Sequence, residues 1–165
     1  FATPTGKFQF ASEKVGEAGL NPVIGFIPRL VQPKDDEFHF IGGKQSIQSH
    51  TMTLNLESLN AVSREYDLER VWLSSADAKK LGVEEGDMVE ISSSEATGKV
   101  AAKVTERLKP GVVFLPTHYG GTSPYLTRAE GFGINFMDFV PFHMEPGVGA
   151  AMTQEVAVKV RKVEA

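Results

Sequence analysis

The most constraining feature of this chain is a series of short apolar segments separated by turn signals between residues 71 and 116. The segments at residues 71–73, 88–92 and 112–115 have the length of strands and contain Val, Ile or Leu. Gly98 and the Pro110-Gly111 pair mark turns between them. Short strands joined by tight turns predict a mainly β fold, and a closed barrel leaves few strand edges unpaired.

Local patterns place the remaining elements. We expect strands near residues 38–41, 71–73, 88–92, 99–105, 112–115 and 155–163, and a short one at 7–11. One helix is expected at 56–65, where apolar residues have helical spacing and Asn55 can cap the start. A second is expected at 75–81, capped by Ser74 or Ser75 and closed by Gly82.

The first 36 residues differ from the rest. Proline and glycine interrupt every potential long element there, so residues 1–36 are predicted to be an extended arm and residues 37–165 the barrel. The chain begins with Phe, and we therefore expect it to be a processed or excised piece of a longer protein.

Composition excludes several function classes. The net charge is -4, which argues against a general nucleic-acid binder. The chain has no cysteine, so it has no disulfide, thiolate zinc site, Cys-ligated iron–sulfur cluster or Cys nucleophile of its own. No apolar run reaches the length of a membrane span.

The order of motifs resembles the C-terminal domain of the dimethyl-sulfoxide-reductase family of molybdenum and tungsten oxidoreductases. The motifs are SADA at residues 75–78, LG at 81–82, GDMV at 86–89 and PGVVFLP at 110–116. TPTGKF at residues 3–8 and the segment 145–160 extend the resemblance over almost the whole chain. The Gly43-Lys44 pair and HTMTLN at residues 50–55 are most similar to the polysulfide/thiosulfate reductase branch.

This resemblance implies a six-stranded double-psi β-barrel with a few short helices. It implies binding of bis(molybdopterin guanine dinucleotide) with Mo or W, while an iron–sulfur cluster and the metal's protein ligand belong to missing domains of the same parent chain. The cofactor carries the redox reaction and this domain binds and orients it, so the isolated chain is not expected to be catalytic. An iron–sulfur electron-transfer subunit and a membrane anchor subunit are implied partners of the parent. A sulfur oxyanion or polysulfide is an implied substrate, and a periplasmic, membrane-associated or cytoplasmic location all stay open.

The first candidate site is the segment 42–53. Glycine lets backbone N–H groups approach a pyrophosphate, and hydroxyl, Lys and His side chains can donate to its oxygens. The family usually has Arg where Lys44 stands, so a bidentate contact is lost. The alternative is a polar strand and turn with a solvated face. The candidates are Gly43, Lys44, Ser46, Gln48, His50, Thr51 and Thr53.

The second candidate site follows the strand at 112–115. Tyr119 can offer a ring face to a pterin or guanine and His118 a hydrogen bond, although a turn with a half-buried Tyr is the alternative. In the long loop 117–148 and before the last strand, Asn135 and Gln154 are expected to face the same cleft as His50 and His118. The alternatives are that Asn135 caps a turn and that Gln154 is a solvated strand-entry residue.

Two other functions compete with this interpretation. His50, His118 and His143 with Glu145 could in principle ligate zinc, although no two of these histidines have the i, i+3 or i+4 spacing of a helical metal site. A stand-alone double-psi barrel that recognises a substrate or peptide, without a redox role, is the second alternative, since a fold does not fix a function.

Overall fold

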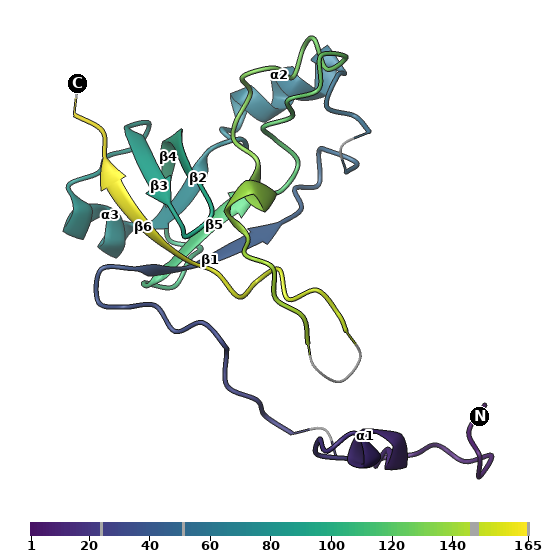
Figure 1. Cartoon of the computed structure of the whole chain (residues 1–165). Coiled ribbons are helices and arrows are strands. Elements are labelled where there is room, and N and C mark those ends of the chain that lie inside the picture. Colours follow the sequence, from purple (N-terminus) through teal and green to yellow (C-terminus); the bar gives the residue numbers. More distant parts are fainter. Residues whose placement is uncertain (24, 51, 146–148, 165) are drawn as a thin grey trace.

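The computed structural model describes residues 1–23, 25–50, 52–145 and 149–164. Within these residues, six strands close into a barrel in the order β1-β5-β2-β4-β3-β6 (Figure 1). The strands are β1 (Phe38–Gly43), β2 (Val71–Ser74), β3 (Met88–Ser92), β4 (Thr97–Thr105), β5 (Val112–Pro116) and β6 (Ala157–Lys162). The pairs β1–β5 and β2–β4 are parallel and the other pairs antiparallel. This topology confirms the predicted six-stranded double-psi β-barrel.

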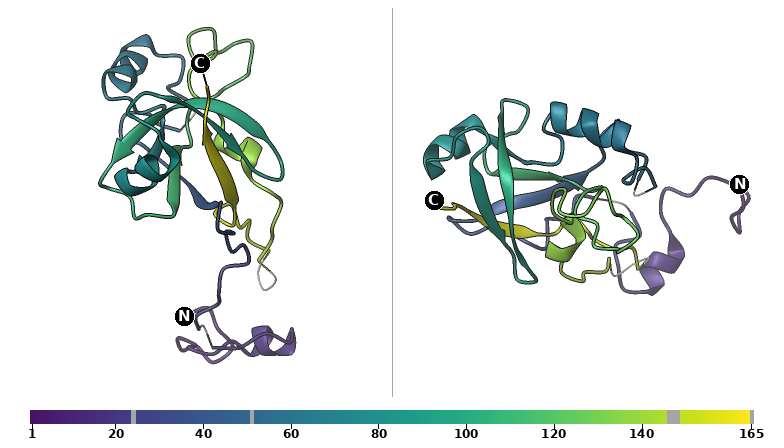
Figure 2. Two further views of the ribbon diagram at one scale, coloured as in Figure 1. Left: turned by 90° about the vertical axis from the view of Figure 1, so that its left-hand side faces the viewer. Right: turned by 90° about the horizontal axis from the view of Figure 1, so that it is seen from above.

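Alternate residues of each strand fill the barrel, as the period of a strand requires. The buried strand residues are Phe38, Phe40, Val71, Leu73, Val89, Ile91, Val100, Ala102, Val113, Leu115, Val158 and Val160. Two further elements cover opposite ends of the barrel (Figures 1 and 2). At one end Phe136 and Phe139 of the 3₁₀ helix η1 (Phe136–Phe139) pack on Phe40, with ring centroids 5.0 and 5.6 Å away. At the other end lies α3 (Ser75–Leu81).

The SADA motif builds the α3 end of the barrel. Ser74 caps the helix by accepting a hydrogen bond from the Asp77 N–H at 3.1 Å, and Gly82 ends it at φ 66°, as expected. The buried Asp77 carboxylate accepts from the Ser74 hydroxyl at 2.6 Å and from the Gly111 N–H at 2.9 Å. One carboxylate therefore joins the helix to the turn that precedes β5, which makes this motif structural.

The helix α2 (Glu57–Glu65) forms where it was expected, and its apolar Leu59 and Val62 are half-buried. Its buried residues are Asn60 and Ser63, while Leu56 precedes the helix and is 51% exposed. The expected cap is wrong: Asn55 accepts from the Arg128 N–H at 2.9 Å and donates to the Tyr125 carbonyl, so it joins the helix entrance to the long loop. Beside the barrel, Leu54, which precedes the helix, packs with Tyr119 and Ala129 of this loop in a second small core.

The N-terminal residues 1–23 lie away from the barrel in Figure 1 and in the left view of Figure 2. They contain α1 (Glu13–Glu17), and the strand expected at 7–11 is reduced to an isolated bridge between Ala11 and Val23. Residues 29–36 return to the barrel through hydrogen bonds and ion pairs. The division into an arm (1–36) and a barrel (37–165) stays a prediction. No helix in the described part of the chain has the length and apolar character needed to cross a bilayer.

Candidate functional site

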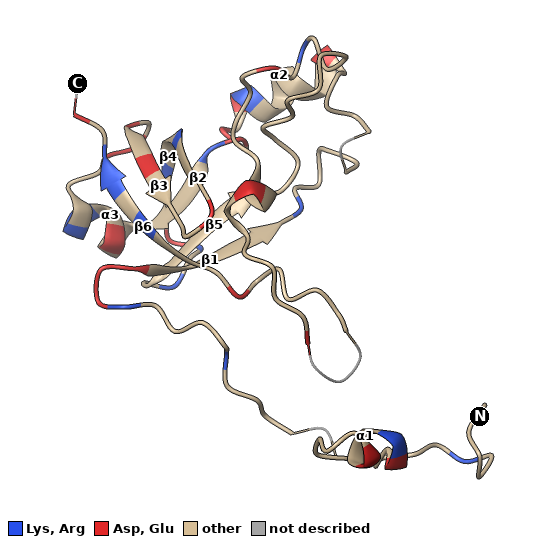
Figure 3. Ribbon diagram, viewed as in Figure 1, with Lys and Arg blue, Asp and Glu red and all other residues tan. Residues whose placement is uncertain are grey.

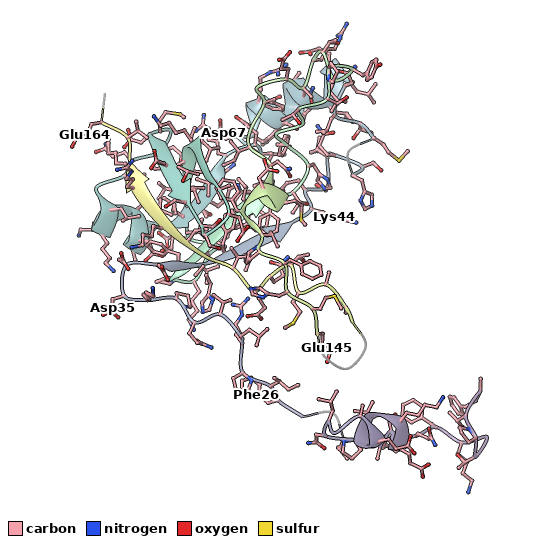
Figure 4. The ribbon with its side chains drawn as sticks, in the orientation of Figure 1. Phe26, Asp35, Lys44, Asp67, Glu145 and Glu164 are labelled. Carbon is pink, nitrogen blue, oxygen red and sulfur yellow. The ribbon has the colours of Figure 1, made fainter. Side chains whose placement is uncertain are left out.

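The two candidate segments leave the same edge of the barrel. Strands β1 and β5 run parallel with Gly43 opposite Pro116, so their carboxyl ends lie together. The Thr117 N–H and hydroxyl both donate to the Gly43 carbonyl, at 3.0 and 3.3 Å. Lys44 projects from the end of β1 at this edge (Figure 4). The candidate segment 42–53 and the residues that follow β5 therefore leave the barrel side by side.

Both glycines at the end of β1 are required for packing inside the protein. A Cβ on Gly42 would lie 2.7 Å from the Thr117 methyl group, and a Cβ on Gly43 would lie 2.8 Å from the Phe114 ring. The expected reason for glycine was the approach of a phosphate. The structure shows another reason, because neighbouring side chains occupy the space that a Cβ would need.

A group of basic side chains lies at this edge, and we call Lys44, His50 and His118 the basic cluster. The Lys44 ammonium donates to Nε2 of His50 at 2.9 Å, and the rings of His50 and His118 are 5.9 Å apart in an edge-on arrangement. Lys44 and His50 are exposed, whereas His118 is only 3% exposed. The cluster thus offers an exposed ammonium at the surface and a buried imidazole beside it.

The buried imidazole of His118 has an unmet polar atom. Its Nε2 has no hydrogen-bond partner among the described residues. Burial, reinforced by the neighbouring His50 and Lys44, lowers the pKa of His118 below its usual 6.5. A buried nitrogen without a partner is costly, and a ligand that accepts or donates a hydrogen bond there relieves that cost.

The chemistry of the cluster suits an anion. Ammonium and imidazole groups donate to several oxygens at once, and a negative charge compensates for their mutual repulsion. The described residues contain no group of three His, Cys, Asp or Glu side chains that could hold a metal ion. Elsewhere, acidic and basic residues are interspersed over the barrel surface (Figure 3).

Three of the predicted site residues lie in or beside the second core. Gln48 is 4% exposed; its amide donates to Asn60 and Ser63 at 3.1 and 3.3 Å and accepts from the Thr53 hydroxyl at 2.7 Å. The Tyr119 hydroxyl donates to the same Ser63 oxygen at 2.9 Å. These side chains hold the two candidate segments against α2. Asn60 and Ser63 were not among the predicted residues. Their i, i+3 spacing, which places them on one side of the helix, was the signal that could have indicated them.

Two other predicted residues lie elsewhere or outside the described region. Ser46 is exposed and lines both a cavity of about 540 Å³ formed by residues 44–50 and one of about 490 Å³ beside Trp72 and Lys103. Thr51 lies outside the described residues. The candidate hydroxyl nearest to the basic cluster in sequence is therefore not placed.

Asn135 and Gln154 are both bonded to the protein. Asn135 caps η1: its amide oxygen accepts from the Met137 N–H at 3.2 Å and its nitrogen donates to Asp138 at 2.7 Å. Its cavity, of about 270 Å³, is lined by five glycines and differs from the one formed by residues 44–50. The Gln154 amide bonds to both backbone groups of Gly42, at 3.0 and 3.2 Å. Thus the turn-cap alternative describes the local geometry of Asn135.

Comparison with known proteins identifies relatives of this chain. It is 28% identical over 188 residues to the molybdopterin-containing subunit of arsenate respiratory reductase from Chrysiogenes arsenatis, covering 91% of this chain and 22% of that protein. It is 26% identical over 128 residues to a dimethyl sulfoxide reductase from Escherichia coli, covering 68% of this chain and 15% of that protein. The chain thus spans less than a quarter of the length of either relative.

A solved structure has the same fold. Acetylene hydratase from Pelobacter acetylenicus superposes with a TM-score of 0.80 at 15% identity, over 98% of this chain and 24% of that chain. The family model described as the molydopterin dinucleotide binding domain matches residues 38–151, which is more than half of the chain and includes the barrel edge with the basic cluster. The chain therefore belongs to the molydopterin dinucleotide binding domain family, in agreement with the resemblance found in its sequence.

Proposed function

We propose that the basic cluster holds the pyrophosphate of the molybdopterin dinucleotide. The observation that carries this proposal is Nε2 of His118, which is buried without a partner among the residues that the structure describes, beside two further cationic or donor groups. A pyrophosphate supplies both the acceptor oxygens and the negative charge that this cluster lacks. The residues present therefore fit the group that the family binds.

Each predicted residue has a proposed role in this arrangement. Lys44 and His50 contact the phosphate oxygens from the solvent side and His118 from the barrel side, with hydroxyls of Ser46 and Thr51 as further donors. Gln48, Thr53 and Tyr119 act indirectly, because their bonds to each other and to α2 fix the two segments. The packed Gly43 sets the backbone from which Lys44 projects. Asn135 presents an amide edge to the pterin or guanine from its glycine-lined cavity, and Gln154 acts through Gly42.

We further propose that the chain is one domain of a larger oxidoreductase. The support is that it spans 22% and 15% of the two relatives named above. In that enzyme bis(molybdopterin guanine dinucleotide) with Mo or W, when bound, carries the electron transfer to or from the substrate, and this chain binds and orients its nucleotide parts. We also propose that this enzyme contains an iron–sulfur cluster and that it works with an electron-transfer subunit and a membrane anchor subunit. The substrate that we propose for the larger enzyme is a sulfur oxyanion or polysulfide.

Binding of a dinucleotide to the 165-residue chain should strengthen as the pH falls. The pKa of free His118 lies below 6.5 because of burial and its basic neighbours, and a bound anion raises that pKa. The bound state therefore takes up a proton, so affinity rises as the pH falls through the bound-state pKa of His118 and levels off below its free-state pKa. The probe is diguanosine pyrophosphate, whose pyrophosphate diester keeps a constant charge in this range. NMR titration should give a Kd weaker than about 1 μM, since other domains share the cofactor.

The control for this experiment is His118→Gln, which keeps a polar side chain but does not titrate. We expect its affinity to vary much less between pH 7.5 and 5.5 than that of the unmodified chain. An affinity that is independent of pH in the unmodified chain, or the same pH dependence in His118→Gln, would show that the pyrophosphate does not contact His118. Sub-micromolar binding would contradict the sharing of the cofactor among several domains.

A further inference from the structure

One arginine of the arm contacts strand β1 and the residues that precede β6. The Arg29 guanidinium donates to the Gln154 carbonyl at 2.8 Å and to Nδ1 of His39 on β1 at 3.0 Å. It also lies 3.6 Å from the carboxylate of Glu155, which accepts from the Val31 N–H at 3.0 Å. The side chain of Glu155 is only 13% exposed. These contacts fasten the last part of the arm to β1 and to the residues that lead into β6.

Gln154, whose carbonyl accepts from Arg29, continues the β1–β6 hydrogen-bond ladder with its side chain. The backbone ladder pairs His39 with Ala157, and the Phe40 N–H donates to the Val156 carbonyl at 3.0 Å. At Gly42 the partner is instead the Gln154 amide, which accepts from the Gly42 N–H and donates to the Gly42 carbonyl. A primary amide carries the donor and acceptor of a peptide group, so it can replace a strand residue at this point.

We propose that Arg29 is a positioning residue: it locks the arm to the barrel and, through Gln154, fixes the backbone of Gly42 two residues before Lys44. The lock follows from contacts within this chain. Its consequence for cofactor binding rests on the proposed function of the basic cluster. In this arrangement, the place of the arm and the place of the anion-binding segment are coupled, and movement of one loosens the other.

A second contact between arm and barrel does not provide this coupling. Lys159 pairs with Asp36 at 2.6 Å, but the two side chains are 56% and 63% exposed. Exposed pairs of this kind contribute little, about 0–1 kcal/mol. The bond between Lys159 and Asp36 also involves neither Gly42 nor Gln154. Lys159→Ala is therefore a matched control, since it removes an arm–barrel ion pair without touching the lock.

The lock should also respond to acid through His39. Arg29 can only donate, so Nδ1 of His39 must be unprotonated to accept. The charged groups that face this ring are Arg29 from the arm and Glu155 before β6. Burial, and then Arg29, lower the pKa of His39 below 6.5, while Glu155 opposes them. His39 therefore binds a proton more readily when the arm is released than when the arm is locked. The lock is intact above pH 6.5 and weakens as the pH falls through and below that value.

Amide hydrogen exchange on the 165-residue chain, followed by NMR, tests the coupling. Arg29→Ala should lower the protection factors of the Val31 and Gly42 amides at least tenfold, because both amides depend on residues that Arg29 holds. Protection at Val89 and Val100 in the β3–β4 hairpin should not change. Gln154→Ala should expose Gly42 and leave Val31 protected. Lys159→Ala should leave both amides protected.

Conservative variants keep the test decisive if Arg29→Ala fails to fold. Arg29→Lys retains the charge but cannot reach all three partners, so its protection at Gly42 should be intermediate. His39→Gln keeps an acceptor that does not titrate, and it should abolish the loss of Val31 and Gly42 protection between pH 7.5 and 5.5. Unchanged Gly42 protection in Arg29→Ala and Arg29→Lys, or an equal loss in Lys159→Ala, would overturn the proposal. None of these exchange measurements requires a bound dinucleotide. Their outcome is therefore independent of whether the proposed function of the basic cluster is correct.

Discussion

Gly120→Ala should lower the free energy of unfolding of this chain by about 3–5 kcal/mol. A Cβ at Gly120 would lie 2.1 Å from the backbone nitrogen of Asn135 and 2.2 Å from the carbonyl carbon of Ile134. These are main-chain atoms, so no side-chain rotation relieves the overlap. The residue also has φ +76°, which disfavours any side chain. Urea or thermal unfolding measures the loss, with a shift of Tm of about 2–4 °C for each kcal/mol in a chain of this length.

Gly131→Ala is the matched control in the same loop region. Gly131 has φ +70°, but no atom lies within 4 Å of its Cβ position. Only the left-handed backbone conformation is then penalised, which costs about 1–2 kcal/mol. Equal losses in the two variants would show that residues 120 and 134–135 are not in close contact. The comparison therefore tests how tightly residues 134–135, which lead into η1, are held against the segment that carries His118.

The barrel was predictable because its signals are local. Strand β3 has the expected bounds, and the others differ from the expected bounds by up to two residues at either end. Gly82 ends α3 at a positive φ, and Ser74 caps it, as the side-chain chemistry of these residues requires. Turn residues and alternating apolar positions carry this information within a few neighbours, so no distant contact had to be known.

The sequence was less informative where the place of a side chain depends on partners that are distant in the chain. The apolar spacing of α2 indicated a helix but not the burial of its polar residues Asn60 and Ser63, which bond to Gln48 and Tyr119. Their polarity suits a small core built around hydrogen bonds, which no period in the sequence reveals. Nothing in the sequence indicated that the Gln154 amide completes a ladder to Gly42, which lies 112 positions away, and the expected place of Gln154 at a cofactor stays a prediction. Some polar residues near a binding site therefore contact the ligand, and others hold the protein backbone in place. Only the folded structure distinguishes the two groups.

His118→Phe should affect stability and dinucleotide binding in opposite directions. Within the described part of the chain, Nε2 of His118 is buried and has no hydrogen-bond partner, which is an unfavourable state for a polar atom. Phenylalanine keeps an aromatic ring opposite His50 and removes that atom. The free energy of unfolding should therefore stay the same or rise slightly. A purely structural histidine would instead lose stability on this substitution.

Binding should suffer because the pyrophosphate loses a charge-assisted hydrogen bond. Such a bond contributes about 1.5–3 kcal/mol, which corresponds to roughly a 10- to 100-fold weaker Kd. In an enzyme that contains this chain, the same substitution should lower the molybdenum or tungsten content per protein while the fold survives. Lys44→Met is the companion variant: Lys44 is exposed, so stability should not change, and binding should again weaken. If His118→Phe destabilises the chain and leaves binding and metal content intact, His118 is a structural residue and the pyrophosphate lies elsewhere.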